Sequence, residues 1–150
     1  MIAAANILSE DFGIQADVWS CPSFNELKRD GDDCVRWNLM HPDQKPKIPH
    51  VTACLEKHSG PVVAATDYVK LFADQIRAYV GRYFHVLGTD GFGRSDTRAS
   101  LRRHFEVNRY YVTVAALKTL ADEGTILAKT VKSAIRKYKL DPEKPNPLDV

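Results

Sequence analysis

The uncharged run at residues 61–66, Pro-Val-Val-Ala-Ala-Thr, constrains the fold of this chain more than any other stretch. A short, continuously apolar run is typical of a strand that is buried on both faces, as in a parallel sheet. A second such run lies at residues 83–87, and a segment with helical periodicity separates the two. Parallel neighbours need a crossover connection, which is usually a helix. We therefore predict a β-α-β arrangement at the centre of the fold.

Helices are predicted on either side of these strands. Residues 1–11 are rich in helix-forming side chains, and Gly13 is a natural stop. Ser23 and Glu26 form a capping box, so a second helix should open just after Ser23 and stop near Gly31. The other predicted elements are a strand at 16–20, a loop at 41–49, and helices near 51–55, at 68–80 with Asp67 as cap, at 97–105, between Asn108 and Gly124, and at 125–139.

Strands that alternate with helices predict a doubly wound α/β domain with a mainly parallel sheet. We assign residues 1–140 to a single domain, because a chain of 150 residues supports one core. Residues 141–150 contain three prolines and are predicted to form a C-terminal tail. Only three strands are visible, and no strand precedes the opening helix. We therefore expect the chain to begin inside a domain whose first strand is missing.

Composition and charge argue against several classes of function. Lys and Arg number 21 against 19 Asp and Glu, a formal net charge of +2, so we expect no nucleic-acid partner. No apolar run approaches the roughly 18 residues of a membrane helix, and the N-terminus lacks the basic region of a signal peptide. The three cysteines form no CxxC pair, which indicates reduced thiols. We expect a cytoplasmic protein with no membrane partner.

Polar residues follow both central strands, at the edge where open α/β sheets bind their ligands. Thr66 and Asp67 follow the first strand, and Thr89 and Asp90 follow the second. These residues could form a polar rim around an anion or a substrate. A helix cap at Asp67 and a turn at Asp90 explain them better. Whether the rim binds a ligand stays open at this point.

A glycine-rich loop and a basic stretch come after the second strand. The glycines at 88–93 follow the pattern G-x-x-G-x-G, whereas dinucleotide-binding loops have G-x-G-x-x-G, so we favour a structural loop. Arg94, Arg98 and Arg102 recur every four residues along one helix face. They could meet phosphates or a partner that carries carboxylates. Acidic neighbours favour an ion-pair network that is solvated or lies at a subunit interface.

The chain carries no motif of a nucleophilic or metal-dependent enzyme. Neither Gly-x-Ser-x-Gly nor HExxH occurs, and the five histidines lack metal-ligand spacing. Cys54 and His58 stand four residues apart on a predicted helix, but no cleft and no orienting third group accompany them. We therefore assign no catalytic, cofactor-binding or metal-binding residue to this chain.

Longer motifs carry a resemblance to one enzyme family. They are DVWS at 17–20, SFNELKRDG at 23–31, ATDYVKLFA at 65–73, VLGTDGFGRSD at 86–96 and LRRHFEV at 101–107. In this order they resemble the C-terminal domain of the homodimeric bacterial pyruvate dehydrogenases, which belong to the transketolase-like superfamily. These thiamine-diphosphate-dependent enzymes are the decarboxylating components of pyruvate dehydrogenase complexes. The resemblance covers essentially the whole chain.

The resemblance implies a three-layer α/β/α fold with a mostly parallel sheet, like the third domain of transketolases. It also implies that thiamine diphosphate and Mg²⁺ are held by other domains of a parent enzyme, and that this chain binds no cofactor. The parent would decarboxylate pyruvate and acetylate the lipoyl group of the acetyltransferase. The implied partners are the remaining domains, a second subunit of a homodimer, dihydrolipoyl acetyltransferase and dihydrolipoyl dehydrogenase.

We expect a non-catalytic domain that supports dimer assembly. Phe92, Arg94 and Tyr110 are the candidate interface residues. Two alternatives stay open at this point. One is a stand-alone regulatory or small-anion-binding α/β module, and the other is a small enzyme that uses the polar rim.

Overall fold

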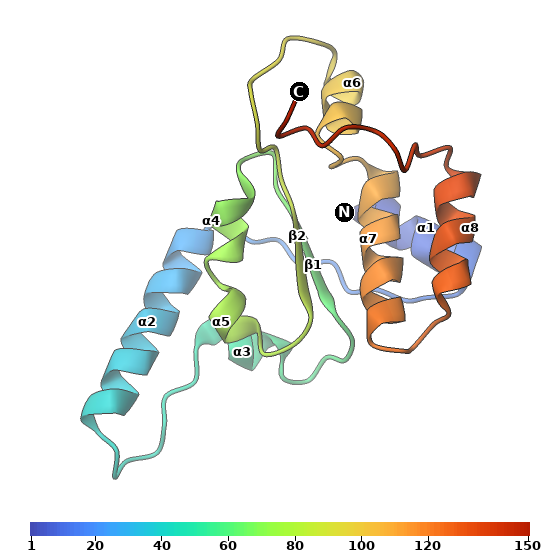
Figure 1. Cartoon of the computed structure of the whole chain (residues 1–150). Coiled ribbons are helices and arrows are strands. Elements are labelled where there is room, and N and C mark those ends of the chain that lie inside the picture. Colours follow the sequence, from blue (N-terminus) through green and yellow to red (C-terminus); the bar gives the residue numbers. More distant parts are fainter.

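The computed structural model describes all residues from 1 to 150 and contains eight helices and two strands (Figure 1). In chain order the elements are α1 Ile2–Phe12, α2 Phe24–Met40, α3 His50–Leu55, β1 Val62–Ala65, α4 Lys70–Asp74, α5 Arg77–Val80, β2 Phe84–Leu87, α6 Arg98–His104, α7 Arg109–Asp122 and α8 Ala128–Lys137.

The two strands form a parallel sheet between two layers of helices. Val62 of β1 stands opposite Phe84 of β2, and Ala65 stands opposite Leu87. Helices α2 to α5 lie on one side of the sheet, whereas α7 packs on the other side with α1 and α8 behind it (Figure 1). Both predicted central strands are confirmed, as is the three-layer α/β/α arrangement with a parallel sheet.

The predicted strand at 16–20 does not form. These residues run as extended chain, and none of their backbone groups is hydrogen-bonded to another backbone group. Val18 and Trp19 are about half exposed. The segment is held by side chains instead, because Asp17 accepts a 2.8 Å hydrogen bond from His58 and Trp19 packs edge-on against the same ring. The apolar residues of this segment are therefore not sufficient to make it a strand, because it does not pair with the free edge of either β1 or β2.

The cap at Ser23 is confirmed, but the reciprocal half of the capping box does not form, because the Glu26 carboxylate is paired with Arg29. The predicted stop at Gly31 is wrong. The Ser23 hydroxyl accepts a 3.2 Å hydrogen bond from the backbone N–H of Glu26. Helix α2 then continues without interruption to Met40. Gly31 is buried against the ring of Tyr79, which occupies the space where a Cβ would lie. This glycine therefore allows α2 and α5 to approach closely rather than ending the helix.

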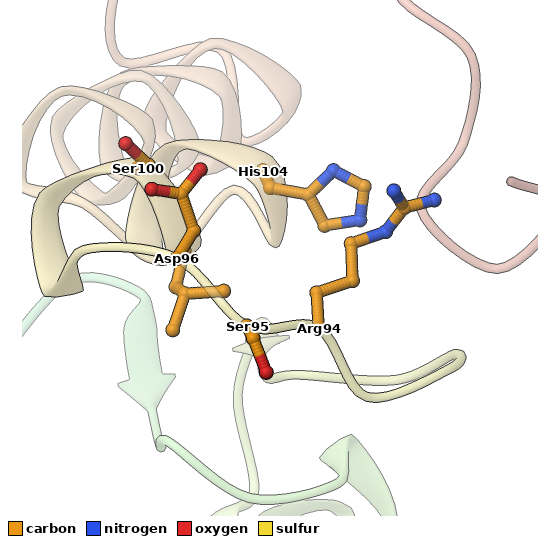
Figure 2. Close-up of a pocket in the computed structure, with 6 residues that line it drawn as sticks. Arg94, Ser95, Asp96, Ser100 and His104 are labelled. Carbon is orange, nitrogen blue, oxygen red and sulfur yellow. The ribbon is translucent and has the colours of Figure 1, made fainter.

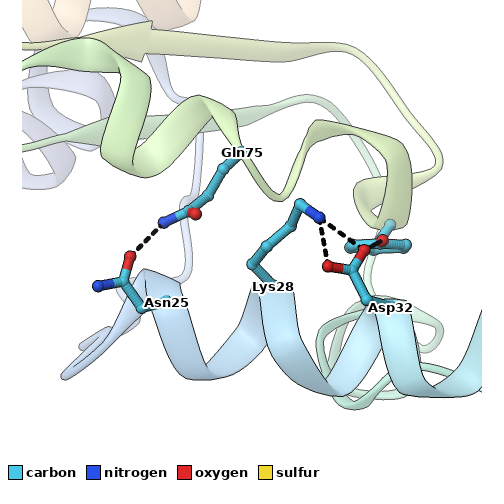
Figure 3. Close-up of polar contacts among 5 residues, drawn as sticks. Asn25, Lys28, Asp32 and Gln75 are labelled. Atoms are coloured by element: carbon cyan, nitrogen blue, oxygen red, sulfur yellow. Dashed lines mark hydrogen bonds and ion pairs between the residues drawn. The ribbon is translucent and has the colours of Figure 1, made fainter.

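Polar contacts reinforce the approach of α2 to the helices between the strands. The Gln75 amide donates a 2.7 Å hydrogen bond to the Asn25 side chain (Figure 3). Lys28 binds the Asp32 carboxylate, which also accepts a hydrogen bond from the Tyr79 hydroxyl. Tyr79 thus packs on α2 through its ring and is oriented through its hydroxyl.

The crossover between the strands differs from the prediction in two ways. The expected single helix at 68–80 is divided into α4 and α5, and Asp67 does not cap it. The cap comes from another segment, because Asp90 accepts a 2.9 Å hydrogen bond from the backbone N–H of Lys70. A carboxylate supplied from beyond β2 therefore satisfies a donor in the first turn of α4.

The predicted helix ends at Gly13, Asn108 and Gly124 are confirmed, whereas the helix predicted at 125–139 spans only Ala128–Lys137. Asn108 accepts hydrogen bonds from the backbone N–H groups of Tyr110 and Tyr111 at the start of α7. Gly13 and Gly124 adopt left-handed conformations directly after α1 and just beyond α7, with φ of 67° and 78°. Such conformations favour glycine, so these two residues do end helices as expected.

Candidate functional site

The polar rim at the carboxyl ends of the strands is occupied by the chain's own contacts. Asp90 binds the backbone of Lys70 and lies 3.6 Å from its ammonium group. The Thr66 hydroxyl accepts a hydrogen bond from the Tyr68 N–H, and the Thr89 N–H donates to the Tyr68 carbonyl at 2.9 Å. Thr89 and Asp90 thus hold the loop after β2 to the segment after β1, and Thr66 fixes the loop after β1 internally.

The C-terminal segment covers the same end of the sheet. The Lys144 ammonium donates to the carbonyl of His104 at 2.6 Å and to the Glu106 carboxylate at 3.0 Å. The Pro147 carbonyl lies only 2.5 Å from where a Cβ of Gly91 would stand, and Gly91 has a φ of 108°. The space left between this segment and the loop after β2 is a cavity of about 40 Å³, which is room for about one water molecule.

A larger cavity of about 290 Å³ lies between α6 and the loop that precedes it (Figure 2). The Thr97 hydroxyl caps α6 by accepting a hydrogen bond from the Ser100 N–H, and the Thr97 N–H donates to Asp96 at 2.6 Å. This turn folds the loop back over the helix. The cavity is lined by Arg94, Ser95, Asp96, Ser100, Leu101 and His104, of which only Leu101 is apolar.

His104 is the most unusual side chain of this cavity. Its Nε2 atom is buried and has no hydrogen-bond partner. Its ring and the guanidinium of Arg94 point toward one another (Figure 2). Burial lowers the pKa of His104, and the nearby charges of Arg94 and Lys144 lower it further against a smaller opposing effect of Glu106. The imidazole is therefore neutral near pH 7.

The three candidate interface residues do not share one environment. Phe92 is 78% exposed in the loop before α6, and Arg94 of the same loop lines the cavity. Tyr110 is 38% exposed, but its ring stacks on Tyr138 at 4.9 Å and so helps to join α7 to the end of α8. Their role at a subunit interface stays a prediction.

The pair of Cys54 and His58 does not form. The Cys54 sulfur instead lies 3.4 Å from Nε2 of His50, and His58 is bound to Asp17. No group of three or more His, Cys, Asp or Glu side chains is placed to hold a metal ion. None of the helices is both long and apolar enough to cross a membrane.

The sequence analysis missed the cavity and the role of His104 in it. That residue lies inside the LRRHFEV motif and was given no role of its own. The available signal was the i, i+4 spacing of Ser100 and His104, which places both side chains on one face of α6. The turn at Asp96 and Thr97, which brings Arg94 to this face, could not be derived from spacing alone.

Comparisons with known proteins agree with this fold. Residues 1–108 match the model of the transketolase-like TK C-terminal domain family. The chain is 58% identical over 150 residues to a pyruvate dehydrogenase E1 component of Cupriavidus necator, a match that covers 100% of this chain and 17% of that relative. It is 60% identical over 147 residues to the corresponding component of Pseudomonas aeruginosa, with 97% and 17% covered.

A third relative, the pyruvate dehydrogenase E1 component of Escherichia coli K12, is 52% identical over 145 residues, which are 96% of this chain and 16% of that relative. The chain thus spans about one sixth of the length of the relatives that it matches. The family model covers well over half of the chain and describes a domain of the architecture found here. This chain belongs to the transketolase-like TK C-terminal domain family.

Proposed function

We propose that this chain forms the C-terminal domain of a pyruvate dehydrogenase E1 component. Such an enzyme decarboxylates pyruvate with thiamine diphosphate and Mg²⁺ and transfers the acetyl group to the lipoyl group of dihydrolipoyl acetyltransferase. The observation that carries the proposal is identity of 58% to a pyruvate dehydrogenase E1 component along the full 150 residues. Identity at this level over a whole domain supports a shared role as well as a shared fold.

Within this enzyme the domain would support assembly of a homodimer and take no part in bond making or breaking. The contacts of the polar rim support this role, because Thr66, Thr89 and Asp90 hold loops together. The exposed ring of Phe92, in a loop that protrudes from the domain, supplies apolar surface for a neighbour. The proposed partners are the remaining domains, a second subunit, dihydrolipoyl acetyltransferase and dihydrolipoyl dehydrogenase, in the cytoplasm.

The cofactor belongs to the other domains in this proposal. A Mg²⁺–diphosphate site needs oxygen ligands that converge on the ion. Asp90, the best placed carboxylate at the carboxyl end of the sheet, is already bound to Lys70 through its backbone and its ammonium group. We therefore assign no step of the thiamine chemistry to residues of this chain.

A chimeric enzyme tests the proposal. In the Pseudomonas aeruginosa relative, the matched segment is replaced by this chain, and pyruvate-dependent NADH formation is measured with the other components of the complex. We expect activity within a few-fold of the parent and a dimer in sedimentation. The control lacks the segment altogether and should lose both dimerisation and activity. A folded, dimeric chimera without activity, or a control as active as the parent, would contradict the proposal.

A further inference from the structure

The cavity beside α6 is an open hollow of about 290 Å³ on the surface of the domain. Four of its lining residues, Arg94, Ser95, Asp96 and Ser100, are exposed. Five of its six lining residues are polar or charged, so the hollow suits a polar ligand rather than an apolar one.

The two ends of the cavity differ in charge. Arg94 and His104 lie together at one end, whereas Asp96 and Ser100 lie at the other (Figure 2). Asp96 is engaged by the backbone of Thr97, and the Ser100 hydroxyl is paired with the Thr97 hydroxyl at 2.9 Å. The polar groups of the acidic end therefore already have partners.

The basic end lacks such partners. Arg94 forms no salt bridge or hydrogen bond, although the nearby chain contains several carboxylates. Glu106, whose charge also acts on His104, is bound to Lys144. The Nε2 atom of His104 is buried and unpaired. A buried polar atom without a partner in a native fold commonly marks the position of a missing ligand, ion or water.

We propose that the Arg94–His104 end of the cavity binds one small oxyanion, a phosphate or a carboxylate group. The guanidinium supplies the charge and two parallel donors. The neutral imidazole supplies a third donor in its Nε2–H form. The opposite end, with its Asp96 carboxylate, repels a second anionic group and favours a ligand whose far side carries a hydroxyl or an amine.

The charges around His104 support the same assignment. Arg94 and Lys144 both disfavour the protonated ring, and burial does so more strongly. An anion bound between Arg94 and His104 offsets the positive charge of Arg94 and accepts a hydrogen bond from the His104 ring. Binding must therefore raise the pKa of His104, which gives the test a readout at the proposed atom. This inference does not depend on the proposed function.

A titration followed by NMR tests the proposal. Inorganic phosphate, and separately sodium acetate, is added to the 150-residue chain at constant ionic strength, and the His104 ring signals are recorded as a function of pH. We expect a saturable shift and a raised His104 pKa with at least one of the two anions. Tighter binding of phosphate identifies a phosphate group as the preferred ligand chemistry, and tighter binding of acetate identifies a carboxylate.

Two variants separate the site from general attraction to a basic helix. Arg94→Gln should weaken binding at least tenfold, because it removes both the charge and the paired donors. Arg102→Gln removes the same charge from an exposed position of α6 outside the cavity and should change binding less than twofold. The phosphate titration is then repeated by calorimetry on the chimeric enzyme, in which this chain is part of a dimer.

Either of two results would overturn the proposal. One is a His104 pKa that responds to phosphate and acetate no more than to chloride. The other is equal weakening by Arg94→Gln and Arg102→Gln, since this would mean that the helix attracts anions without a defined site.

Discussion

The molecule has two hydrophobic cores on opposite sides of its sheet, and they are built in different ways. The sheet core is formed by Val51, Ala73, Ile76, Val80, Phe84 and Val86, all from one continuous quarter of the chain. The helix core is formed by Leu8, Leu117, Val131 and Ala134, so it joins α1 to α7 and α8 across more than a hundred residues. The sheet core forms between elements that are close in sequence, whereas the helix core depends on contacts between the two ends of the chain.

This difference decides what holds each side together. Near the sheet core, α4 and α5 have only five and four residues and are positioned by specific partners, such as Gly31 of α2 under Tyr79 and Asp90 at the start of α4. In the helix core, helices of 10 to 14 residues pack through fully buried apolar side chains such as Leu117. We therefore expect the sheet side to be sensitive to particular contacts and the helix side to be sensitive to lost volume.

The largest expected effect comes from a cavity in the helix core. Leu117 has no exposed surface, so Leu117→Ala should lower the free energy of unfolding by about 2–5 kcal/mol in urea titrations. Leu71→Ala is the matched control, because Leu71 is 72% exposed on α4. It should change stability by less than about 0.5 kcal/mol. Equal losses in the two variants would show that the helix core is not tightly packed.

A smaller effect should follow from filling the space under Tyr79. Alanine normally stabilises a helix interior by up to about 1 kcal/mol relative to glycine. Gly31→Ala should instead destabilise this protein by about 1–3 kcal/mol, because the added Cβ collides with the Tyr79 ring. In a Tyr79→Ala background the same substitution should become neutral or stabilising. A double-mutant cycle in urea measures this reversal, and additive effects would contradict the proposed close approach of α2 and α5.

The Tyr79–Asp32 contact should appear as a stability loss at alkaline pH. The hydrogen bond to Asp32, with a further contribution from burial, raises the pKa of Tyr79 to about 12. Because the pKa of Tyr79 is raised in the folded state, its contact with Asp32 stabilises the fold fully at pH values below the ordinary tyrosine pKa of about 10. This stabilisation is lost as pH rises from about 10 through 12. Urea midpoints between pH 9 and 12 should fall less steeply in Tyr79→Phe, and equal slopes would contradict this.

The smallest expected effect concerns the anchor of α1 on the helix core. Hydrogen bonds and ion pairs from Lys137 and Tyr138 lower the pKa of Asp11. Because the pKa of Asp11 is lowered in the folded state, the contacts of its carboxylate stabilise the fold at pH values above the ordinary Asp pKa. This stabilisation is lost as pH falls through the pKa that Asp11 has in the folded protein. Asp11→Asn should therefore speed amide exchange in α1 at pH 7 and have little effect near pH 2.

Hydrogen exchange also compares two helices of the helix core directly. Helix α1 buries only Ala4 and Leu8, so its amides should exchange faster than those of α7. Equal protection of α1 and α7 in the wild-type protein would show that the long-range contacts of the helix core are as strong as its local ones.

Sequence reasoning succeeded where structure is determined locally. The caps at Ser23 and Asn108 and the stop at Gly13 depend on residues within a few positions, and all three are confirmed. The two strands were found because both are short apolar runs bounded by helices. Helix α8 is strongly amphipathic, whereas α7 is recognised by its cap at Asn108 and its stop at Gly124.

Sequence reasoning failed where a distant partner decides the outcome. Gly31 resembles a helix stop until Tyr79 is known to cover it, and Asp67 resembles a cap until Asp90 is seen to take that role. The same holds for the cavity, since Arg94 was proposed as an interface residue and only the turn after it reveals His104 as its neighbour. These contacts join segments whose spacing in sequence carries no signal.

The central claim is that this chain contributes assembly rather than thiamine chemistry. A calorimetric titration of the folded 150-residue chain with thiamine diphosphate and Mg²⁺ tests this claim most directly. We predict heats no larger than those of dilution, because the chain offers no convergent ligands for the metal–diphosphate group. Saturable binding in the micromolar range would contradict the account.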